Sequence, residues 1–311
     1  MFPQLPADFA SVVETTFKNA VASGDLIFSE SERSVLKYDG YTMEVRMAPA
    51  LGQKPKSAPK PDGEGAKKFN PFFPPDPKLV LGGLGDKHTL VLNKFAIVPH
   101  HFLCVTKAEE SQEAPITIED LRATWAALQE PIGTSDRTLA FFNKGKNSGA
   151  SQAHKHIQFL PLDKGTELFP DKVVARTPYE APSERDPVGQ RPLKHSAIPF
   201  EHFILPLPTD PSDEELMMRF WALYHRTLQA LKQNDNWEKS FNWAMTKEWV
   251  IMVPRRADEF EGISVNGTGV VGLLLAKSAA QLAQITELTA GRVLTEVGFP
   301  VGPNTEAHYD Y

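Results

Sequence analysis

Cysteine is nearly missing from this chain of 311 residues, which has Cys104 alone. A single thiol excludes an intramolecular disulfide and a zinc site built from several cysteines. The composition is therefore typical of a protein that works in a reducing compartment. Long apolar runs are missing too, since none approaches the ~20 residues that a membrane-spanning helix needs.

Positive charge is not in excess either, because 33 Lys and Arg face 39 Asp and Glu and the net charge is -6. General binders of nucleic acid or of membrane surfaces need a broad cationic face, so the sequence argues against both classes. The N-terminal stretch MFPQLPADFASVVETTF lacks the basic and apolar regions of a signal peptide. We expect a soluble protein of the cytoplasm or nucleus that binds any anionic ligand through a local cluster of donors.

Apolar periodicity predicts a mixture of helices and strands. The predicted helices cover residues 8–24, 118–128 with Thr117 as N-cap, 213–233 and about 272–297. The predicted strands lie within residues 44–49, 78–84, 88–93, 95–107, 139–143, 151–161 and 240–254. This mixture indicates an α+β protein with antiparallel sheets and flanking helices.

The composition divides the chain into two halves. Residues 164–199 are rich in proline and charge, and they are the predicted connection between residues 1–163 and residues 200–311. An apolar strand that ends in Val-Pro and two basic residues occurs once in each half, as Ile97–His101 and as Met252–Arg256. This echo suggests that two copies of one αβ unit are fused in the chain.

A second segment of unusual composition is GQKPKSAPKPDGEGAKK, residues 52–68. Its many Pro, Gly and Lys residues predict a mobile loop. Its lysines are either solvated linker residues or a basic lid over a phosphate chain, in which case Lys54 is the best candidate.

The stretch SQAHKHIQFLP, residues 151–161, carries the most informative pattern. Alternate side chains of a strand point to the same face. One face of this strand therefore presents two imidazoles and an amide, from His154, His156 and Gln158. The other face presents Ile157 and Phe159 to the core, with Lys155 on the same side.

Three interpretations of that polar face compete. Two imidazoles can bind a zinc or iron ion, although the further ligands would have to come from distant residues such as His100, His101 or His202. Both histidines can instead be structural, with backbone carbonyls as partners in a polar cleft. The third interpretation is nucleophilic catalysis by one histidine.

A neutral imidazole can attack phosphorus and form a phosphoramidate, which splits one transfer into two easier steps. The other ring nitrogen must then be held by an acceptor, and the phosphate oxygens need hydrogen-bond donors. The loop Gly149–Gln152 offers backbone amides and a hydroxyl to a phosphate. Gln158 offers amide hydrogens on the same face and cannot compete as a general acid.

Several blocks of the sequence together resemble the fungal-type ATP adenylyltransferases, also called diadenosine tetraphosphate phosphorylases. The blocks are LNKFAIVPHHFLCVTK (92–107), NKGKNSGASQAHKHIQFLPL (143–162) and SFNWAMTKEWVIMVPRR (240–256). The likeness extends from NPFFPP near Asn70 to GLLLAKS near Lys277. These enzymes belong to the histidine triad superfamily, in the branch with galactose-1-phosphate uridylyltransferase. The resemblance implies a histidine-triad-like fold with two such halves fused.

The resemblance also implies a reaction, the reversible phosphorolysis of diadenosine tetraphosphate by inorganic phosphate to ATP and ADP. By the family's pattern His156 is the nucleophile and carries AMP in a covalent intermediate, while His154 supports the phosphate site. Gln158 stands where hydrolytic members of the superfamily carry a third histidine. We interpret its amide as favouring phosphate over water as the acceptor.

The same resemblance implies a wider set of substrate-binding residues. They are Lys54, which enters only by its position in the loop, and Asn93, Lys94, Asn143, Gly149, Ala150, Ser151, Gln152, Thr246, Lys247, Met252 and Arg256. A chain of four phosphates needs several Lys or Arg donors, which agrees with the cations in this set. Magnesium is implied as a companion of the polyphosphate, without dedicated protein ligands and without an organic cofactor.

A fused pair of halves supplies internally what smaller relatives obtain by dimerising, so the expected state is a monomer. Two alternatives stay open. One is another nucleotidylyltransferase, with a uridylyl or sugar-nucleotide substrate. The other is a non-catalytic module that binds a nucleotide or a metal.

Overall fold

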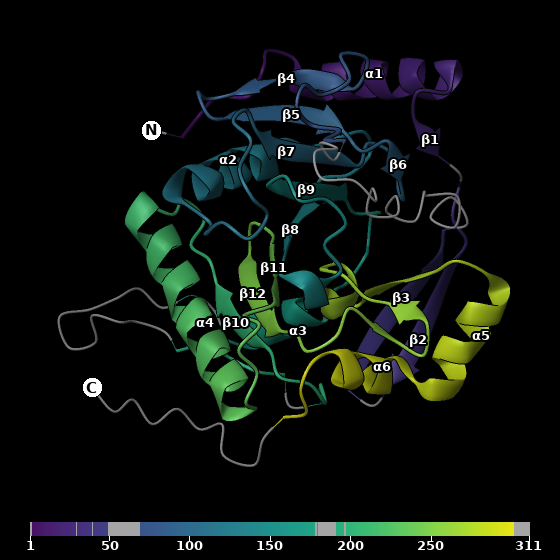
Figure 1. The fold of residues 1–311 in the computed structure, drawn as a ribbon, viewed down its shortest axis with the longest axis vertical. Helices are drawn as coiled ribbons and strands as arrows, with labels where there is room; N and C mark the ends of the chain where they lie inside the picture. The colour runs from purple at the N-terminus through teal and green to yellow at the C-terminus, as the bar shows by residue number, and fades with distance from the viewer. Residues whose placement is uncertain are drawn as a thin grey trace, which may run out of the picture.

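The computed structural model describes residues 2–301 except 29, 39, 49–68, 178, 180–190 and 196. Its centre is an antiparallel sheet of eight strands to which both halves of the chain contribute (Figure 1). In spatial order the strands are β10 (Phe203–Pro206), β12 (Trp249–Pro254), β11 (Phe241–Met245), β8 (Thr138–Lys144), β9 (His156–Pro161), β7 (Phe102–Thr106), β5 (His88–Leu92) and β4 (Val80–Leu84). The predicted α+β class with antiparallel sheets is confirmed.

Three helices cover one face of this sheet: α1 (Phe9–Ser23), α2 (Ile118–Gln129) and α4 (Asp213–Gln233). They pack on large strand side chains such as Phe102, Phe142 and Trp243, which form the larger core. Figure 1 shows α2 and α4 side by side along this face, and α1 beyond the β4 edge. Within the described residues, no helix combines the length and apolar character needed to cross a bilayer.

A smaller sheet and three shorter helices cover the opposite face. They are β2 (Arg33–Tyr38), β3 (Tyr41–Met47), β15 (Leu273–Ala276), α3 (Phe169–Arg176), α5 (Ala279–Leu288) and α6 (Ala290–Val297). The second core lies here and includes Phe141, Trp249 and Ile251. The remaining short elements are β1 (Ile27–Phe28), β6 (Phe95–Ala96), β13 (Glu259–Phe260), β14 (Ile263–Ser264) and the 3-10 turns η2 (Lys146–Ser148) and η3 (Gly269–Val271).

Local capping chemistry explains why three helices begin or end where the sequence predicts. Thr117 and Asp120 form a capping box at the start of α2, and Ser212 and Glu215 form another at the start of α4. Gly24 ends α1 in the left-handed conformation, with φ 76°. These contacts satisfy backbone groups that the helix ends would otherwise leave without partners.

Two of the predicted elements are wrong in extent. The segment 272–297 is not one helix, because its apolar start forms β15, which pairs in parallel with β3, and Thr289 with φ 66° separates α5 from α6. The run 95–107 is not one strand either. It breaks between β6 and β7, where His100 adopts a φ of 61°.

The central sheet has an internal repeat of the order strand, helix, strand, strand. The first copy is β7, α2, β8, β9 and the second is β10, α4, β11, β12, and the two copies meet at the β8 and β11 pair. The Val-Pro echo does not mark equivalent places, since Pro99 precedes β7 whereas Pro254 ends β12. The equivalent residues are His101-Phe102 and His202-Phe203. In each pair the histidine precedes the strand and the phenylalanine is its first residue, in β7 and in β10.

Candidate active site

The strands β8 and β9 pair over part of their length and then separate. Their register runs from Thr138 opposite Pro161 to Phe141 opposite Gln158. Beyond that point the chain between them forms η2 and a loop, and returns at His156, the first residue of β9. His156 therefore lies in the fork between two strands, where its side chain is 4% exposed.

The alternation predicted for β9 is present. Ile157 and Phe159 lie in the larger core under the helices. His156 pairs with Val105 of β7 and Gln158 pairs with Leu103, which places both polar side chains on the opposite face of the sheet. Gln158 is partly exposed, so its amide is accessible from that face.

The ring of His156 is held in one tautomer. Its Nδ1 lies 2.8 Å from the carbonyl oxygen of His154. A carbonyl oxygen can only accept, so Nδ1 carries the proton and Nε2 carries the lone pair. The backbone thus orients the imidazole and leaves the nucleophilic electron pair on the outer nitrogen.

His154 is fixed just as firmly, but both its ring nitrogens contact neighbouring side chains or backbone. Nε2 donates to the carbonyl oxygen of Thr106 at 2.8 Å, and the Nδ2 amide of Asn70 donates to Nδ1 at 2.9 Å. The side chain is 3% exposed. We therefore assign His154 a supporting role, since its main-chain carbonyl orients His156 and its ring anchors the segment around Asn70.

An apolar pocket of about 230 Å³ lies beside Phe72, whose ring contacts that of His156. Phe72 forms one wall, and its ring centroid lies 5.4 Å from that of His156. The full lining is Phe72, Phe73, Pro74, Pro75, Thr89, Val105, Thr106 and Lys107. Such a pocket suits a flat, mostly apolar group, with a lysine at its edge.

The glycine loop after β8 is anchored from the second half of the chain. Asn242 of β11 donates from Nδ2 to the carbonyl oxygen of Ser148 and to Oδ1 of Asn143, each at 2.8 Å. Gly149 follows with φ 78°, and a Cβ at this position would lie 2.6 Å from the carbonyl oxygen of Val265. The loop is therefore pressed against the segment that precedes η3.

Arg255 connects these anchors. Its guanidinium is fully buried and donates to Oδ1 of Asn242 and to the carbonyl oxygens of Ala257 and Val265. Burial lowers the pKa of Arg255 to about 9, so the group keeps its charge and its donors at neutral pH. One buried cation thus organises the glycine loop, which leads from β8 to the residues before His156.

Replacing Gly149 with alanine is expected to lower turnover at least about tenfold and to destabilise the protein, because the new Cβ must displace backbone. Gly165→Ala is the matched control, since Gly165 has φ 81° and nothing within 4 Å of an added Cβ. It should cost only about 1 kcal/mol of backbone strain and leave turnover intact. Steady-state rates and thermal unfolding of both variants check this, and equal effects of the two would contradict it.

Some of the predicted substrate-binding residues lie at the fork between β8 and β9. Asn143 lies on β8, level with His156, and its Oδ1 also accepts from the backbone N–H of Gly267 at 2.8 Å. Gly149, Ala150, Ser151 and Gln152 form the loop that joins the fork's two arms. Asn143 acts here as a buried support, being 2% exposed.

Asn93 and Lys94 lie between β5 and β6. The Asn93 side chain accepts from the backbone N–H of Phe95 at 3.0 Å, and its amide nitrogen lies 3.3 Å from the His101 ring. Because His101 precedes β7 by one residue, this turn lies near the partner strand of β9. Lys94 is exposed.

The outcome differs among the remaining predicted residues. Thr246 and Lys247 form the turn between β11 and β12, at the end of the sheet away from His156. Met252 is fully buried in the larger core, beneath the face opposite His156. Arg256 is paired with Glu296 at 2.7 Å. Lys54 and the loop 52–68 lie outside the described residues.

The alternative of a metal site receives no structural support. Within the described ranges, no group of three or more His, Cys, Asp or Glu side chains could hold a metal ion. His100 pairs with Glu14 at 2.7 Å, and His202 lies in the second copy of the repeat, 0% exposed.

The sequence does not predict the residues that contact and position the two histidines and the glycine loop. They are Asn70, Phe72, Thr106, Gln112, Asn242 and Arg255. Five of these six stand in the quoted blocks, where the sequence argument rests on their neighbours, and only Gln112 lies outside them. Buried polar residues inside apolar strands, such as Asn242, are the signal that could have pointed to them.

Comparison with known proteins completes the description of this site. The family model "Ap4A phosphorylase N-terminal domain" matches residues 3–175, and "ATP adenylyltransferase C-terminal domain" matches residues 196–300. Protein APA1 of Saccharomyces cerevisiae is 31% identical over 317 residues, covering 95% of this chain and 96% of that protein. Diadenosine 5',5'''-P1,P4-tetraphosphate phosphorylase 2 of the same yeast is 32% identical over 324 residues, covering 96% and 97%.

Solved structures agree with the sequence matches. Yeast Ap4A phosphorylase Apa2 in complex with Ap4A superposes with a TM-score of 0.81 at 29% identity, covering 96% of this chain and 99% of that one. The complex of Apa2 with AMP gives a TM-score of 0.82 at 28% identity, covering 97% and 100%. The chain therefore belongs to the Ap4A phosphorylase family, the diadenosine tetraphosphate phosphorylases.

Proposed function

We propose that this enzyme cleaves diadenosine tetraphosphate (Ap4A) with inorganic phosphate to ATP and ADP, and that His156 carries the AMP group between the two steps. The observation that supports this most is the fixed tautomer of His156, whose Nδ1 donates to the carbonyl of His154. A ring in this form attacks without prior removal of a proton. The fold and nearly full-length similarity to yeast Ap4A phosphorylases support the choice of substrate.

The proposed chemistry proceeds in two displacements at one phosphorus atom. Nε2 of His156 attacks the adenylyl phosphorus, the bond to the bridging oxygen breaks, and ATP leaves. A phosphate oxygen then attacks the same phosphorus, the N–P bond breaks, and ADP leaves with the imidazole restored. The carbonyl of His154 stabilises the positive charge on the ring during the first step, through the Nδ1 proton.

The surroundings supply binding and charge for this reaction. The pocket beside Phe72 is proposed to hold the adenine of the transferred AMP, next to the nucleophile. Backbone amides of the glycine loop are proposed to hold the phosphate oxygens. The substrate is proposed to bring Mg²⁺ on its polyphosphate, with Lys54 and Lys94 as further cations near the chain of phosphates.

The assembly and compartment are part of the same proposal. The two copies of the repeat meet within one chain at β8 and β11, which supports a monomer. Light scattering after gel filtration tests that state. We propose the cytoplasm or nucleus as the compartment, since a chain with one cysteine, the buried Cys104, can form no internal disulfide.

Gln158→His is expected to raise the share of the intermediate that is lost to water severalfold, with AMP as product in place of ADP. Gln158 lies on the same face as His156 and offers an amide, which cannot take a proton from water, whereas an imidazole can. Chromatographic ratios of AMP to ADP at fixed phosphate measure the partition. An unchanged ratio would contradict this role of the amide.

The proposed reaction is tested by product analysis. The protein and Mg²⁺ are incubated with Ap4A, once with and once without phosphate, and the nucleotides are separated by ion exchange. Equal amounts of ATP and ADP that depend on phosphate support the proposal. ATP with AMP in both samples would indicate a hydrolase, and turnover of only uridylyl or sugar nucleotides would favour the first alternative.

A further inference from the structure

The segment 107–117, here called the strap, joins β7 to α2 and runs alongside the residues that precede β9. Its backbone pairs with them. Lys155 N donates to the carbonyl oxygen of Glu110 at 2.8 Å, and Gln112 N donates to that of Ala153 at 2.7 Å. The strap therefore takes the place of a neighbouring strand where β8 has already moved away.

The side chain of Gln112 fills the fork between β8 and β9. Its Oε1 accepts from the backbone N–H of His156 at 2.8 Å. Its Nε2 donates to the carbonyl oxygen of Asn143 at 2.9 Å and to that of His156 at 3.3 Å. The side chain is 3% exposed. One buried amide thus binds both backbone polar groups of the nucleophile and ties them to β8.

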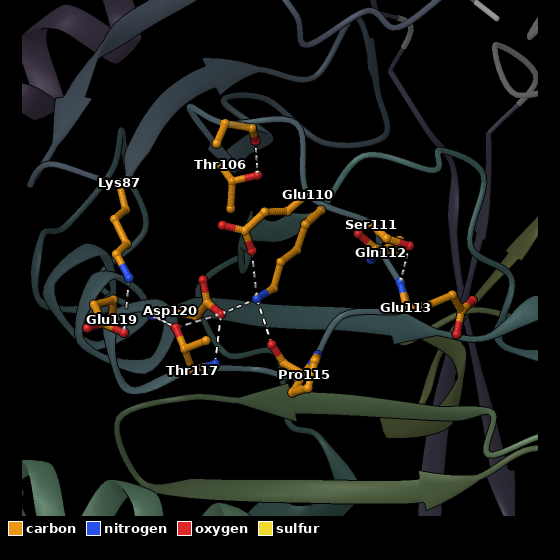
Figure 2. A network of polar contacts seen from close by, with 12 residues as sticks. Lys87, Thr106, Glu110, Ser111, Gln112, Glu113, Pro115, Thr117, Glu119 and Asp120 are labelled. Carbon is orange, nitrogen blue, oxygen red and sulfur yellow. Dashed lines mark hydrogen bonds and ion pairs between the residues drawn. The ribbon is translucent and has the colours of Figure 1, made fainter.

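The strap is itself held in place by Lys155, the residue between His154 and His156. The Lys155 ammonium donates to the carbonyl oxygen of Pro115 at 2.7 Å and contacts Asp120 at 2.6 Å and Glu110 at 3.5 Å. Figure 2 shows Glu110, Pro115 and Asp120 converging on this one ammonium group, with Ser111, Gln112 and Glu113 to one side of it. Glu110 and Pro115, on either side of Gln112 in the strap, therefore meet at a single buried cation.

The carboxylate of Asp120 stays ionised at working pH. Burial alone would raise the pKa of Asp120, but the hydrogen bond from His88 and the Lys155 ammonium lower it to about 2. Thr117, the N-cap of α2, also donates to Asp120 from its backbone at 2.8 Å. Asp120, which binds Lys155, is therefore also part of the capping box that starts α2.

We infer that Gln112 is a positioning residue for the proposed reaction and sets the place of the His156 ring relative to the phosphorus. Without its amide, the first residue of β9 would lose the two hydrogen bonds that Gln112 makes to its backbone, and the ring would gain freedom to move. A displacement of about 1 Å at a reacting group can cost up to about 100-fold in rate. The inference rests on the proposed function of His156.

Gln112→Met keeps the length of the side chain and removes its hydrogen bonds. The variant is expected to lose about 10- to 100-fold in kcat for phosphorolysis of Ap4A, with KM changed less than about threefold, because substrate contacts are untouched. Gln129→Met is the control, since the Gln129 side chain donates to the carbonyl oxygen of Trp125 in its own helix, α2. A kcat near that of the wild type, or a loss that lies in KM, would overturn the inference.

Gln112→Glu supplies a readout that a general loss of stability would not move. At neutral pH its carboxylate still accepts from His156 N–H but repels the carbonyl oxygens of Asn143 and His156. Once protonated, it donates to one of them again. The ratio of its kcat to that of the wild type should therefore rise as pH falls from about 8 to about 5. A ratio that does not change with pH would overturn the inference. This test does not depend on Gln112→Met, so it applies even if that variant does not fold.

The wild-type rate in the same series separates the two proposals. If the wild type shows no phosphate-dependent cleavage of Ap4A, the proposed function fails. If the wild type is active and both Gln112 variants match it, the reaction stands and only the positioning role fails.

Discussion

Replacing His156 with alanine is expected to lower phosphorolysis of Ap4A by about 10⁴-fold or more, because the variant lacks the atom that forms the covalent bond to phosphorus. The chain as a whole should stay folded, since the ring lies at the first residue of a strand, on the face of the sheet away from the larger core. Rates come from chromatographic separation of ATP and ADP. Ap4A that is labelled on its adenine shows whether AMP stays bound to the protein. The His156→Ala variant should retain no label.

His202 is a matched control within the same chain. Its Nδ1 also donates to the carbonyl oxygen of the residue two positions earlier, Phe200, at 2.7 Å. Its Nε2 accepts from the backbone N–H of His195 at 2.8 Å, and burial lowers the pKa of His202 to about 3. His202→Ala should therefore reduce stability and leave labelling within about threefold of the wild type. More than a tenth of the wild-type rate in His156→Ala would contradict the assignment.

Replacing Arg255 with methionine is expected to destabilise the protein by about 3–5 kcal/mol, the range seen when one partner of a buried charged network is removed. Oδ1 of Asn242 and the carbonyl oxygen of Val265 would lose a donor in a buried place, and the partly buried carbonyl oxygen of Ala257 would lose one as well. The glycine loop depends on Asn242, so turnover should fall as well at temperatures where the variant is folded. Urea unfolding followed by tryptophan fluorescence measures the first effect.

Arg256→Met provides the comparison, since this neighbouring arginine is exposed and paired with Glu296. An exposed ion pair contributes at most about 1 kcal/mol, so this variant should unfold close to the wild type. Equal unfolding free energies for the two variants would show that the buried guanidinium does not organise the loop.

The parts of the fold that the sequence predicts well are those set by local contacts. The start of α2 follows from Thr117 and Asp120, and the end of α1 follows from Gly24. The apolar run Leu273–Ala276 carries no such local signal, because a short buried strand and a helical segment look alike. Its state is decided by pairing with β3, more than 200 residues earlier in the chain.

The candidate site divides in the same way. The two-residue period of β9 places His156 and Gln158 on one face, a prediction that needs only the strand itself. Gln112 lies 44 residues before the histidine whose backbone it binds, and Arg255 lies 13 residues from Asn242 across a turn. These partners meet only after the sheet has formed, so periodicity cannot identify them.

The central claim is that AMP rests on His156 between two displacements. The most direct measurement is to incubate the protein with Ap4A and Mg²⁺ in the absence of phosphate, then digest it and map the adenylylated peptide by mass spectrometry. The account predicts one AMP group, on Nε2 of His156, which is released as ADP when phosphate is added. AMP attached to a different residue, or turnover with no adenylylated peptide, would contradict it.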